Sequence, residues 1–379
     1  MVVKKKYKIG IVCYPTYGGS GVVATELGIA LANKGHEVHF ISYSQPFRLD
    51  SVSDKTFFHE VTVPDYPLFD YTPYELNLTS KLVDVVLHEK IDILHVHYAI
   101  PHASAAIQAK NILETYGIEI PIVTTLHGTD ITLLGKDKSF KPVIEYAINK
   151  SDAVTSVSLD LKKETLYHFK ITKPIDVIPN FIDSNLYDSE GDKFLRSKIA
   201  SSEEKIIIHV SNFRKVKRVK DVVSIFEIIE KAMPAKLLMI GDGPERIKAE
   251  QLCRKFNISK KVRFMGKLKS VENFMSISDL FLLPSEKESF GLVALEAMAS
   301  GVTVVSSNSG GLPEINIEGK TGFLSDVADI KAMSENAIKL LSNESMLDKF
   351  KKNAVNHAMK FELSNILPLY ESLYTKLLQ

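Results

Sequence analysis

The stretch that decides the fold is YKIGIVCYPTYGGSGVVATELGIALANKG, residues 7–35. It contains a short apolar run of strand length, then a glycine-rich turn, then a longer segment of helical character. A strand that passes through such a turn into a helix is the first unit of a parallel α/β sheet. The turn lacks the spacing of dinucleotide-binding and P-loop motifs, so it predicts neither of those sites.

The same alternation continues along the chain. The further strand candidates of the first half are residues 37–42, 57–63, 92–97, 121–126 and 153–157, and those of the second half are residues 205–211, 235–241, 261–266, 279–284 and 303–307. Helical patterns separate most of them. This order predicts an α/β fold with two doubly wound, Rossmann-like parallel sheets.

The length of 379 residues also favours two domains. We place an N-terminal domain over residues 1–183 and a C-terminal domain over 184–360, because 184–192 is polar and linker-like. Residues 361–379 are predicted as a helical segment that is broken near Pro368 and packs back on the first domain. Two such domains facing each other would form an interdomain cleft at the carboxyl ends of their strands.

The composition excludes several classes of protein. With 47 basic and 46 acidic residues the chain has no overall field for nucleic acid or for a membrane surface. Two distant cysteines form neither a disulfide framework nor a zinc pattern. Because neither a signal peptide nor an 18-residue apolar stretch is found, we expect a cytoplasmic protein without stable membrane association.

The most informative segment is LPSEKESFGLVALEAMASG, residues 283–301. We place a helix start near Phe290, with Glu288 before it and Glu296 inside it, about 10 to 12 Å apart. That spacing would hold the hydroxyl-bearing groups at the two ends of a diphosphate. The N–H groups that would point at its phosphates are those of Phe290, Gly291 and Leu292. The alternative is an amphipathic helix with solvated glutamates.

A basic cluster follows the strand candidate at 205–211. Its members are Arg214, Lys215, Lys217, Arg218 and Lys220. A solvated helix face is the ordinary interpretation, but the position after a strand favours a clamp for a departing diphosphate. The turns GDGPE at 241–245 and GGLPE at 310–314 are weak signals singly and strengthen the interpretation together.

In the first half, TTLHGTD places His127 directly after a strand candidate. His95, His97 and His102 lie nearby in sequence, but the carboxylate or cysteine ligands of a typical metal site are missing there. No Asp-x-Asp motif occurs, so the usual Mg²⁺-nucleotide device is absent. We therefore expect no metal and no other cofactor, and we expect protein cations to neutralise the leaving group.

These motifs resemble those of the retaining glycosyltransferases of family 4, which have the GT-B architecture of two facing Rossmann-like domains. The resemblance rests on GDGPE, on ESFGLVALEAMASG with its Glu-x7-Glu pair, on GGLPE, and on GGSG and HGTD in the first half. It covers nearly the whole chain. Further segments, among them CYPTYGGSGVVATELG, LHVHYAIPHA and SNFRKVKR, resemble members that move N-acetylglucosamine from UDP-GlcNAc to the hydroxyl of L-malate, the first step of bacillithiol biosynthesis.

The resemblance also implies roles for residues of the C-terminal domain. Glu296 would hold the ribose hydroxyls and Glu288 the sugar hydroxyls, while the backbone at residues 290–292 binds the diphosphate. Arg214 and Lys217 would neutralise the leaving UDP. Many family members have Gly-Arg where this chain has Ser211 and Asn212, so the arginine role passes to Arg214, and Asn212 is placed with the donor-binding residues.

In the N-terminal domain the resemblance implies that His127 contacts the transferred sugar and that Gly19 and Ser20 face the diphosphate. The retained configuration implies attack on the face that the leaving group vacates, with the departing phosphate oxygen as the base. Malate carries two carboxylates, so cationic and hydroxyl donors are needed. We expect Arg48, Tyr98 and Thr125 to supply them, although Arg48 could equally be a surface residue.

Other interpretations stay open at this point. A family 4 enzyme with a lipid or polysaccharide acceptor would use a basic amphipathic face, for which residues 161–173 are a mild candidate. An epimerase would turn over UDP-GlcNAc without an acceptor, and a non-catalytic sensor would bind it without turnover. The sequence leaves open whether the chain forms a homodimer.

Overall fold

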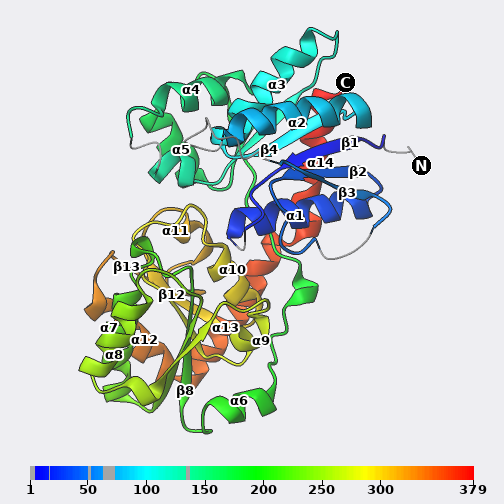
Figure 1. Ribbon diagram of the computed structural model, residues 1–379. Helices are drawn as coiled ribbons and strands as arrows, with labels where there is room; N and C mark the ends of the chain where they lie inside the picture. Colours follow the sequence, from blue (N-terminus) through cyan, green and yellow to red (C-terminus); the bar gives the residue numbers. More distant parts are fainter. Residues whose placement is uncertain (1–4, 17, 50–52, 63–72, 134–136) are drawn as a thin grey trace. The chain divides into compact units, whose positions relative to one another are not determined.

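The computed structural model describes residues 5–16, 18–49, 53–62, 73–133 and 137–379 (Figure 1). The chain divides into two compact units. Unit 1 comprises residues 1–180 and 364–379, and unit 2 comprises residues 181–363. Each unit contains one parallel sheet covered by helices.

Unit 1 is built on a seven-stranded sheet with the order β3-β2-β1-β4-β5-β6-β7. The strands are β1 (Lys8–Val12), β2 (Glu37–Ser42), β3 (Thr56–Glu60), β4 (Ile93–His97), β5 (Ile122–Leu126), β6 (Ala153–Ser156) and β7 (Ile175–Val177). Every adjacent pair is parallel. The strand order reverses between β1 and β4, which is where open parallel sheets bind their ligands.

Helices cover both faces of this sheet (Figure 1). They are α1 (Gly19–Asn33), α2 (Tyr74–Glu89), α3 (Ser104–Glu114), α4 (Lys141–Lys150), α5 (Leu159–His168) and α14 (Leu363–Leu377), with short turns η1 (Ala99–Ala103) and η2 (Thr129–Leu133). Gly28 of α1 packs directly on the ring of Phe40 in β2, where a Cβ atom would overlap that ring. The absence of a side chain at Gly28 therefore lets α1 lie close to the sheet.

The C-terminal helix α14 runs without a break through Pro368, so the predicted interruption was wrong. Proline in a helix interior removes one backbone hydrogen bond. Here the loss is offset by burial, because Leu367, Tyr370 and Tyr374 lie in the core of unit 1. The Tyr374 hydroxyl also bonds to Nδ1 of His95 in β4 at 2.6 Å. Tertiary packing therefore decides the conformation of this segment.

Unit 2 is built on a six-stranded sheet with the order β10-β9-β8-β11-β12-β13. The strands are β8 (Lys205–Val210), β9 (Ala235–Ile240), β10 (Val262–Gly266), β11 (Leu280–Leu283), β12 (Thr303–Ser307) and β13 (Gly322–Ser325). All pairs are parallel. The order is that of the first six strands of unit 1, with the reversal between β8 and β11. The predicted doubly wound α/β fold is confirmed in both units.

The helical elements of unit 2 alternate with its strands. They are η4 (Ser184–Leu186), α6 (Lys193–Ile199), η5 (Lys215–Lys217), α7 (Val219–Ala232), α8 (Arg246–Lys255), η6 (Ser259–Lys261), α9 (Glu272–Ser276), α10 (Leu292–Ala299), α11 (Leu312–Ile315), α12 (Ile330–Leu341), α13 (Glu344–Ala358) and η7 (Met359–Phe361). Helix α7 shows why such segments fold: Val219, Val222, Val223 and Phe226 recur at helical spacing and are all buried in the core.

Several helices begin at a residue whose side chain accepts a backbone N–H of the first turn. Ser158 accepts from Leu161 at the start of α5, and Asp192 accepts from Phe194 at the start of α6. Such caps satisfy N–H groups that have no partner within the helix and contribute about 1 kcal/mol each. The polar residues of the predicted linker segment thus include a helix cap.

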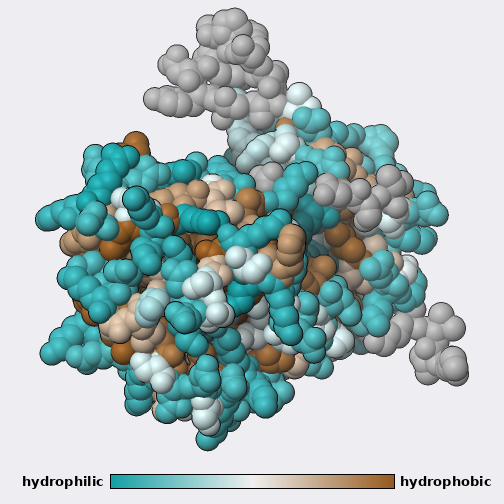
Figure 2. Space-filling model, turned by 90° about the horizontal axis from the view of Figure 1, so that it is seen from below, coloured by the Kyte–Doolittle hydropathy of each residue, from teal (hydrophilic) through white to brown (hydrophobic). Residues whose placement is uncertain are grey.

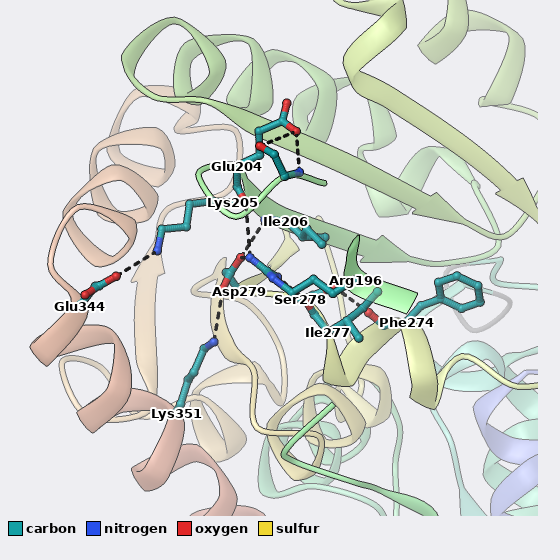
Figure 3. A network of polar contacts seen from close by, with 11 residues as sticks. Arg196, Glu204, Lys205, Ile206, Phe274, Ile277, Ser278, Asp279, Glu344 and Lys351 are labelled. Carbon is teal, nitrogen blue, oxygen red and sulfur yellow. Dashed lines mark hydrogen bonds and ion pairs between the residues drawn. The ribbon is translucent and has the colours of Figure 1, made fainter. Parts of the chain in front are cut away.

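A polar network holds the amino edge of the sheet in unit 2 (Figure 3). Asp279, directly before β11, accepts from Arg196 Nη2 at 2.9 Å and from the backbone N–H of Ile206 at 2.8 Å. Lys351 of α13 lies 3.5 Å from the other carboxylate oxygen. The network therefore joins α6, β8, β11 and α13 at the edge opposite to the one where ligands bind in such sheets.

The surface is mainly hydrophilic on the face shown in Figure 2, with smaller hydrophobic groups between the charged side chains. Among the exposed apolar residues, Leu166 and Tyr167 of α5 are 46% and 84% accessible. None of the helices in the described residues is long and apolar enough to cross a membrane.

Candidate functional site

The predicted site residues follow the carboxyl ends of strands in both units. In unit 2, Lys217 comes after β8 and Glu288 after β11; in unit 1, Tyr98 comes directly after β4 and His127 directly after β5. Carboxyl ends of parallel strands meet at one edge of a sheet. Each unit therefore gathers its own set of candidate residues at that edge.

In unit 2 the centre of this set is a charged pair. Lys217 Nζ lies 2.6 Å from Glu288 Oε1, and the Ser285 hydroxyl donates to the same oxygen at 2.8 Å. Their side chains are partly buried, with 20% of Lys217 and 11% of Glu288 exposed. Lys217 and Ser285 both bond to Oε1, so Oε2 is the carboxylate oxygen that is placed to accept a hydroxyl. The pair joins the basic cluster to the Glu-x7-Glu segment.

Backbone contacts fix the loops that carry this pair. The Glu286 N–H donates to the Val216 carbonyl and the Gly311 N–H to the Glu288 carbonyl, both at 2.8 Å. Gly310 has φ of +64°, and a Cβ atom there would overlap the Glu288 carbonyl. The glycines of SGGLPE are therefore required for close backbone approach. These glycines position Glu288. The turn pattern GGLPE by itself did not indicate that role.

Helix α10 begins at Leu292, two residues later than the predicted start near Phe290. Gly291 precedes it with φ of +96°, a conformation that favours glycine. At the N-terminus of α10, the N–H groups of Ala294 and Leu295 donate to the Gly291 carbonyl. The N–H groups of residues 290–292 precede these bonds, at the positive end of the helix. Glu296 is half-buried in the second turn.

The basic cluster separates into different roles. Lys217 turns to Glu288, whereas Arg218 pairs with Asp221 at 2.5 Å. Lys215, Arg218 and Lys220 line a cavity of about 340 Å³ together with Lys248. Arg214 and Asn212 are exposed on the loop after β8. A single sequence cluster thus supplies a partner for Glu288, part of the lining of a separate cavity that Asp221 and Glu245 also line, and an exposed arginine.

A buried histidine in β8 fixes the start of the loop that follows this strand. His209 in β8 bonds through Nδ1 to the Leu282 carbonyl and through Nε2 to the Ser211 hydroxyl, each at 2.8 Å. Burial lowers the pKa of His209 to about 4, and the positive charge of Lys217 acts in the same direction. The ring is therefore neutral near pH 7. It fixes Ser211, the residue that precedes Asn212.

In unit 1 the glycine-rich turn leads into α1 and towards β4. Gly19 is the first residue of α1, and the Tyr98 hydroxyl donates to the Ser20 hydroxyl at 2.6 Å. At Gly21 a Cβ atom would lie only 2.5 Å from the Thr16 carbonyl oxygen. The glycine at 21 therefore lets the turn fold tightly. The structure brings Ser20 and Tyr98 together, although the sequence places them 78 residues apart.

His127 lies beside Tyr98 and is held by a second histidine. Its Nε2 atom is 2.7 Å from Nδ1 of His97, and its ring centroid is 5.3 Å from that of Tyr98. Burial lowers the pKa of His127 to about 3 and lowers that of His97 well below its usual value. Both rings are therefore neutral at physiological pH. With Nε2 bonded to His97, Nδ1 is the nitrogen of His127 that remains for a ligand.

Thr125 lies inside the sheet rather than at its rim. Its hydroxyl bonds to His95 Nε2 and to the Thr155 hydroxyl, both at 2.7 Å, and the residue is fully buried. These contacts fix His95, whose ring stacks on that of His97. Thr125 is thus connected to His127 through two imidazoles.

Asp130 and His102 bond to the backbone on the two sides of Tyr98. Its Oδ2 atom accepts the Ala99 N–H at 2.6 Å, and burial raises the pKa of Asp130 to about 6. His102 donates from Nδ1 to the His97 carbonyl at 2.5 Å, which fixes the backbone before Tyr98. These bonds set the direction of the turn that carries Tyr98, for which φ is +86°.

Arg48 follows β2 and pairs with Glu26 of α1. Its side chain is 22% exposed, and that of Glu26 is 16% exposed. A carboxylate is therefore already bound to the guanidinium that we expect to bind malate. Arg48 also has a positive φ of 73°, an uncommon conformation for a residue with a side chain.

The side chains that could bind a metal ion are not among the predicted site residues. In the described ranges, the group of three residues able to hold an ion is His39, His59 and Glu89, on β2, β3 and α2. None of the predicted site residues belongs to it.

Several residues that shape the site were not among the predicted site residues. Ser285 shares Glu288 with Lys217, Glu26 holds Arg48, and His97 holds His127. Ser285 lies three residues before Glu288, and alternation in strand 92–97 places His95 and His97 on one face. Those local signals could have found Ser285 and His97. The partner of Arg48 lies in another element, and no local pattern indicates it.

Both units resemble known protein families. Residues 17–186 match the family described as Glycosyltransferase Family 4, and residues 192–357 match Glycosyl transferases group 1. The chain is 48% identical over 376 residues to N-acetyl-alpha-D-glucosaminyl L-malate synthase of Bacillus anthracis, covering 99% of this chain and 98% of that protein.

Solved structures share the fold at low identity. A sucrose-phosphate synthase from Thermosynechococcus elongatus superposes with a TM-score of 0.81 at 20% identity, covering 98% of this chain and 99% of the other. HepE from Anabaena, solved in complex with UDP and glucose, also gives 0.81, at 18% identity, with 97% and 99% covered. These likenesses confirm the predicted GT-B class of fold.

Proposed function

The chain belongs to the family 4 glycosyltransferases, and on that premise we propose that it transfers N-acetylglucosamine from UDP-GlcNAc to the hydroxyl of L-malate with retention of configuration. The observation that carries the proposal is 48% identity to a named GlcNAc-malate synthase over 99% of the chain. The Lys217–Glu288 pair supports the assignment to a donor that leaves as an anion.

The proposed donor site uses the carboxyl edge of unit 2. Glu288 Oε2 accepts hydroxyls of the sugar, while Lys217 and the exposed Arg214 bring positive charge to the diphosphate. The N–H groups of residues 290–292 bind its phosphate oxygens, and Glu296 binds the ribose hydroxyls. Preorganised cations and N–H groups stabilise charge that develops on a leaving group. Asn212 is placed beside them on the loop after β8.

The proposed acceptor and sugar contacts come from unit 1. His127 is neutral, so it binds a sugar hydroxyl through Nδ1 as a hydrogen-bond partner and does not serve as a cationic acid. Gly19 and Ser20 bind the diphosphate through the start of α1. Tyr98 and Arg48 bind malate. Thr125 is proposed to act indirectly, through His95 and His97, because its hydroxyl is buried with two partners.

The reaction balances without a protein nucleophile. The malate hydroxyl oxygen forms a bond to the anomeric carbon as the bond from that carbon to the phosphate oxygen breaks. The hydroxyl proton passes to the departing phosphate oxygen, and UDP leaves. Retaining glycosidases differ, because a carboxylate of the enzyme attacks the sugar there. The site set requires no such carboxylate, and we propose that neither a metal nor another cofactor takes part.

Mass spectrometry of the product tests the proposal. Purified protein is incubated with UDP-GlcNAc and either L-malate or D-malate, without added metal. We expect a GlcNAc-malate adduct from the L-isomer together with UDP. UDP release that is equal with and without malate would support an epimerase or a hydrolase instead. Activity that is lost in EDTA and restored only by Mg²⁺ would contradict the metal-free mechanism.

Two further outcomes separate the remaining alternatives. Tight UDP-GlcNAc binding with no turnover across a panel of hydroxy acids would support a sensor. Transfer to a lipid acceptor in vesicles, with none to malate, would support the lipid alternative, for which α5 offers exposed Leu166 and Tyr167. L-malate-dependent transfer would exclude the epimerase and the sensor.

A further inference from the structure

A group of metal-ligand side chains lies at the β3 edge of the sheet in unit 1, apart from the residues of the proposed transferase site. His39 is in β2, His59 is in the edge strand β3, and Glu89 is the last residue of α2. One ligand atom from each lies within 4.8 Å of the other two. Two imidazoles and one carboxylate are a ligand set that divalent transition metals use in proteins.

The register of the two strands brings the histidines together. His39 is opposite Phe57, two residues before His59, so the side chains of all three point to one face. Helix α2 packs on β2 and ends there with Glu89. The imidazole rings of His39 and His59 stack at 5.1 Å, and His39 Nδ1 lies 2.8 Å from His59 Nε2. Three separate elements thus converge on one point.

These distances suit a bound ion. Zinc binds imidazole nitrogen at about 2.0–2.1 Å, so two ligand atoms of a tetrahedral ion lie about 3.3 Å apart. The present separations, from 2.8 Å up to 4.8 Å, bracket that value. Small side-chain rotations are therefore enough. The ion takes the place of the hydrogen that His59 Nε2 shares with His39 Nδ1, and neutral His59 then carries its proton on Nδ1 instead.

A second carboxylate already orients the buried ligand. His39 is fully buried, and its Nε2 atom lies 3.1 Å from Glu37 Oε1. Glu37 in turn pairs with Lys8 at 2.5 Å, so its charge is held in place. A carboxylate on the far nitrogen is the usual outer partner of a metal-bound histidine, because it fixes the ring and the tautomer. It leaves Nδ1 of His39 with its lone pair towards His59.

We propose that His39, His59 and Glu89 bind one divalent transition metal ion of the Zn²⁺ type, with water completing its coordination. The ion joins the edge strand β3 to β2 and to the end of α2. His59 and Glu89 are only partly buried, so the ion can enter from solvent. Its role is to hold the edge of the sheet, and it takes no part in the transfer reaction.

Zinc titration of the full chain tests this site. The protein is stripped with EDTA, dialysed, and titrated with Zn²⁺ in a calorimeter; Co²⁺ then reports the geometry through its visible absorption. We expect one ion per chain and a higher unfolding midpoint in Zn²⁺. Glu37→Gln should weaken binding about 10- to 100-fold. His59→Gln and Glu89→Gln should weaken it at least as much.

His88→Gln is the matched control, because His88 precedes Glu89 but is exposed and bonds to Asp84 instead. Its Zn²⁺ affinity should equal that of the unmodified chain, and circular dichroism should show every variant folded. The proposal is overturned if binding is unchanged in His59→Gln and Glu89→Gln, if only His88→Gln weakens it, or if no saturable binding occurs up to about 1 mM Zn²⁺.

Discussion

At the carboxyl edge of its sheet, unit 1 gathers imidazoles and hydroxyls, whereas unit 2 gathers an ammonium and a carboxylate at the corresponding edge. The two sheets share their strand order through six strands. His127 and His97 are buried and neutral, while Lys217 and Glu288 keep partial exposure and form an ion pair. The shared strand order therefore carries two kinds of chemistry.

Burial explains the difference. A charged group loses its hydration when it is buried, so fully buried imidazoles stay neutral and act through directed hydrogen bonds. A partly exposed ammonium keeps its charge and can attract an anion. The buried imidazoles of unit 1 are thus suited to hydroxyl groups, and the partly exposed Lys217 of unit 2 is suited to a diphosphate. The predictions below test this contrast from the largest expected effect to the smallest.

Acid should unfold unit 1 before unit 2. Burial lowers the pKa of His95 and His127 to about 3 and that of His102 to about 4, all from 6.5. Because the folded-state pKa lies below the unfolded one, each histidine contributes full stability above pH 6.5 and loses it progressively as the pH falls towards 3 to 4. Among the fully buried histidines, unit 2 has His209, with a pKa of about 4.

Hydrogen exchange followed by mass spectrometry between pH 7 and pH 4 measures this order. Peptides from β4 and β5 should lose protection at a higher pH than peptides from β8 and β11. Asp130 acts in the opposite direction, because its pKa is raised to about 6, but it is one group against several. Earlier loss of protection in unit 2 would contradict the contrast.

Replacement of Lys217 should cause the largest loss of activity. Lys217→Met removes the ammonium beside Glu288, and loss of one such stabilising group lowers kcat by about 100- to 1000-fold. The matched control is Lys220→Met, because Lys220 belongs to the same basic cluster but is exposed and lines the separate cavity. Steady-state kinetics of UDP release compare the two. Equal losses would mean that general positive charge, not the Glu288 pair, is what matters.

Replacement of Asp279 should affect stability and leave catalysis unchanged. Asp279→Asn leaves Arg196 and Lys351 without their shared carboxylate at the amino edge of unit 2 (Figure 3). Because both cations are partly exposed, we expect a loss of about 2 kcal/mol, below the roughly 3–5 kcal/mol of a fully buried pair. The melting temperature should fall by about 4 to 8 °C. A change in KM for UDP-GlcNAc at 25 °C would argue against this division between the two edges.

The smallest effect is expected at Arg48. Arg48→Ala should raise KM for malate about 10-fold, equivalent to about 1.4 kcal/mol, while KM for UDP-GlcNAc stays constant. Glu26→Gln is the informative partner, because it removes the carboxylate that competes for the guanidinium and should leave malate KM equal or lower. An unchanged malate KM in Arg48→Ala removes Arg48 from the site.

Much of the fold followed from local patterns. Among the described residues, strand alternation predicted eleven of the thirteen strands in order, and the two omitted, β7 and β13, have only 3 and 4 residues. The start of α10 was misplaced because Gly291 adopts a left-handed conformation, and a Cβ atom there would also overlap the Leu312 side chain. Pro368 was misjudged because the core around Tyr370 and Tyr374 outweighs one lost hydrogen bond.

The sequence by itself determined which residue types follow each strand, because hydrophobic periodicity and glycine turns are local properties. It placed Glu288, Lys217, Tyr98 and His127 after strand ends. Only the tertiary structure decided that Lys217 meets Glu288, that Arg48 meets Glu26, and that His39 meets His59. Pairing between distant segments depends on the register and packing of whole elements, and no local pattern encodes that information.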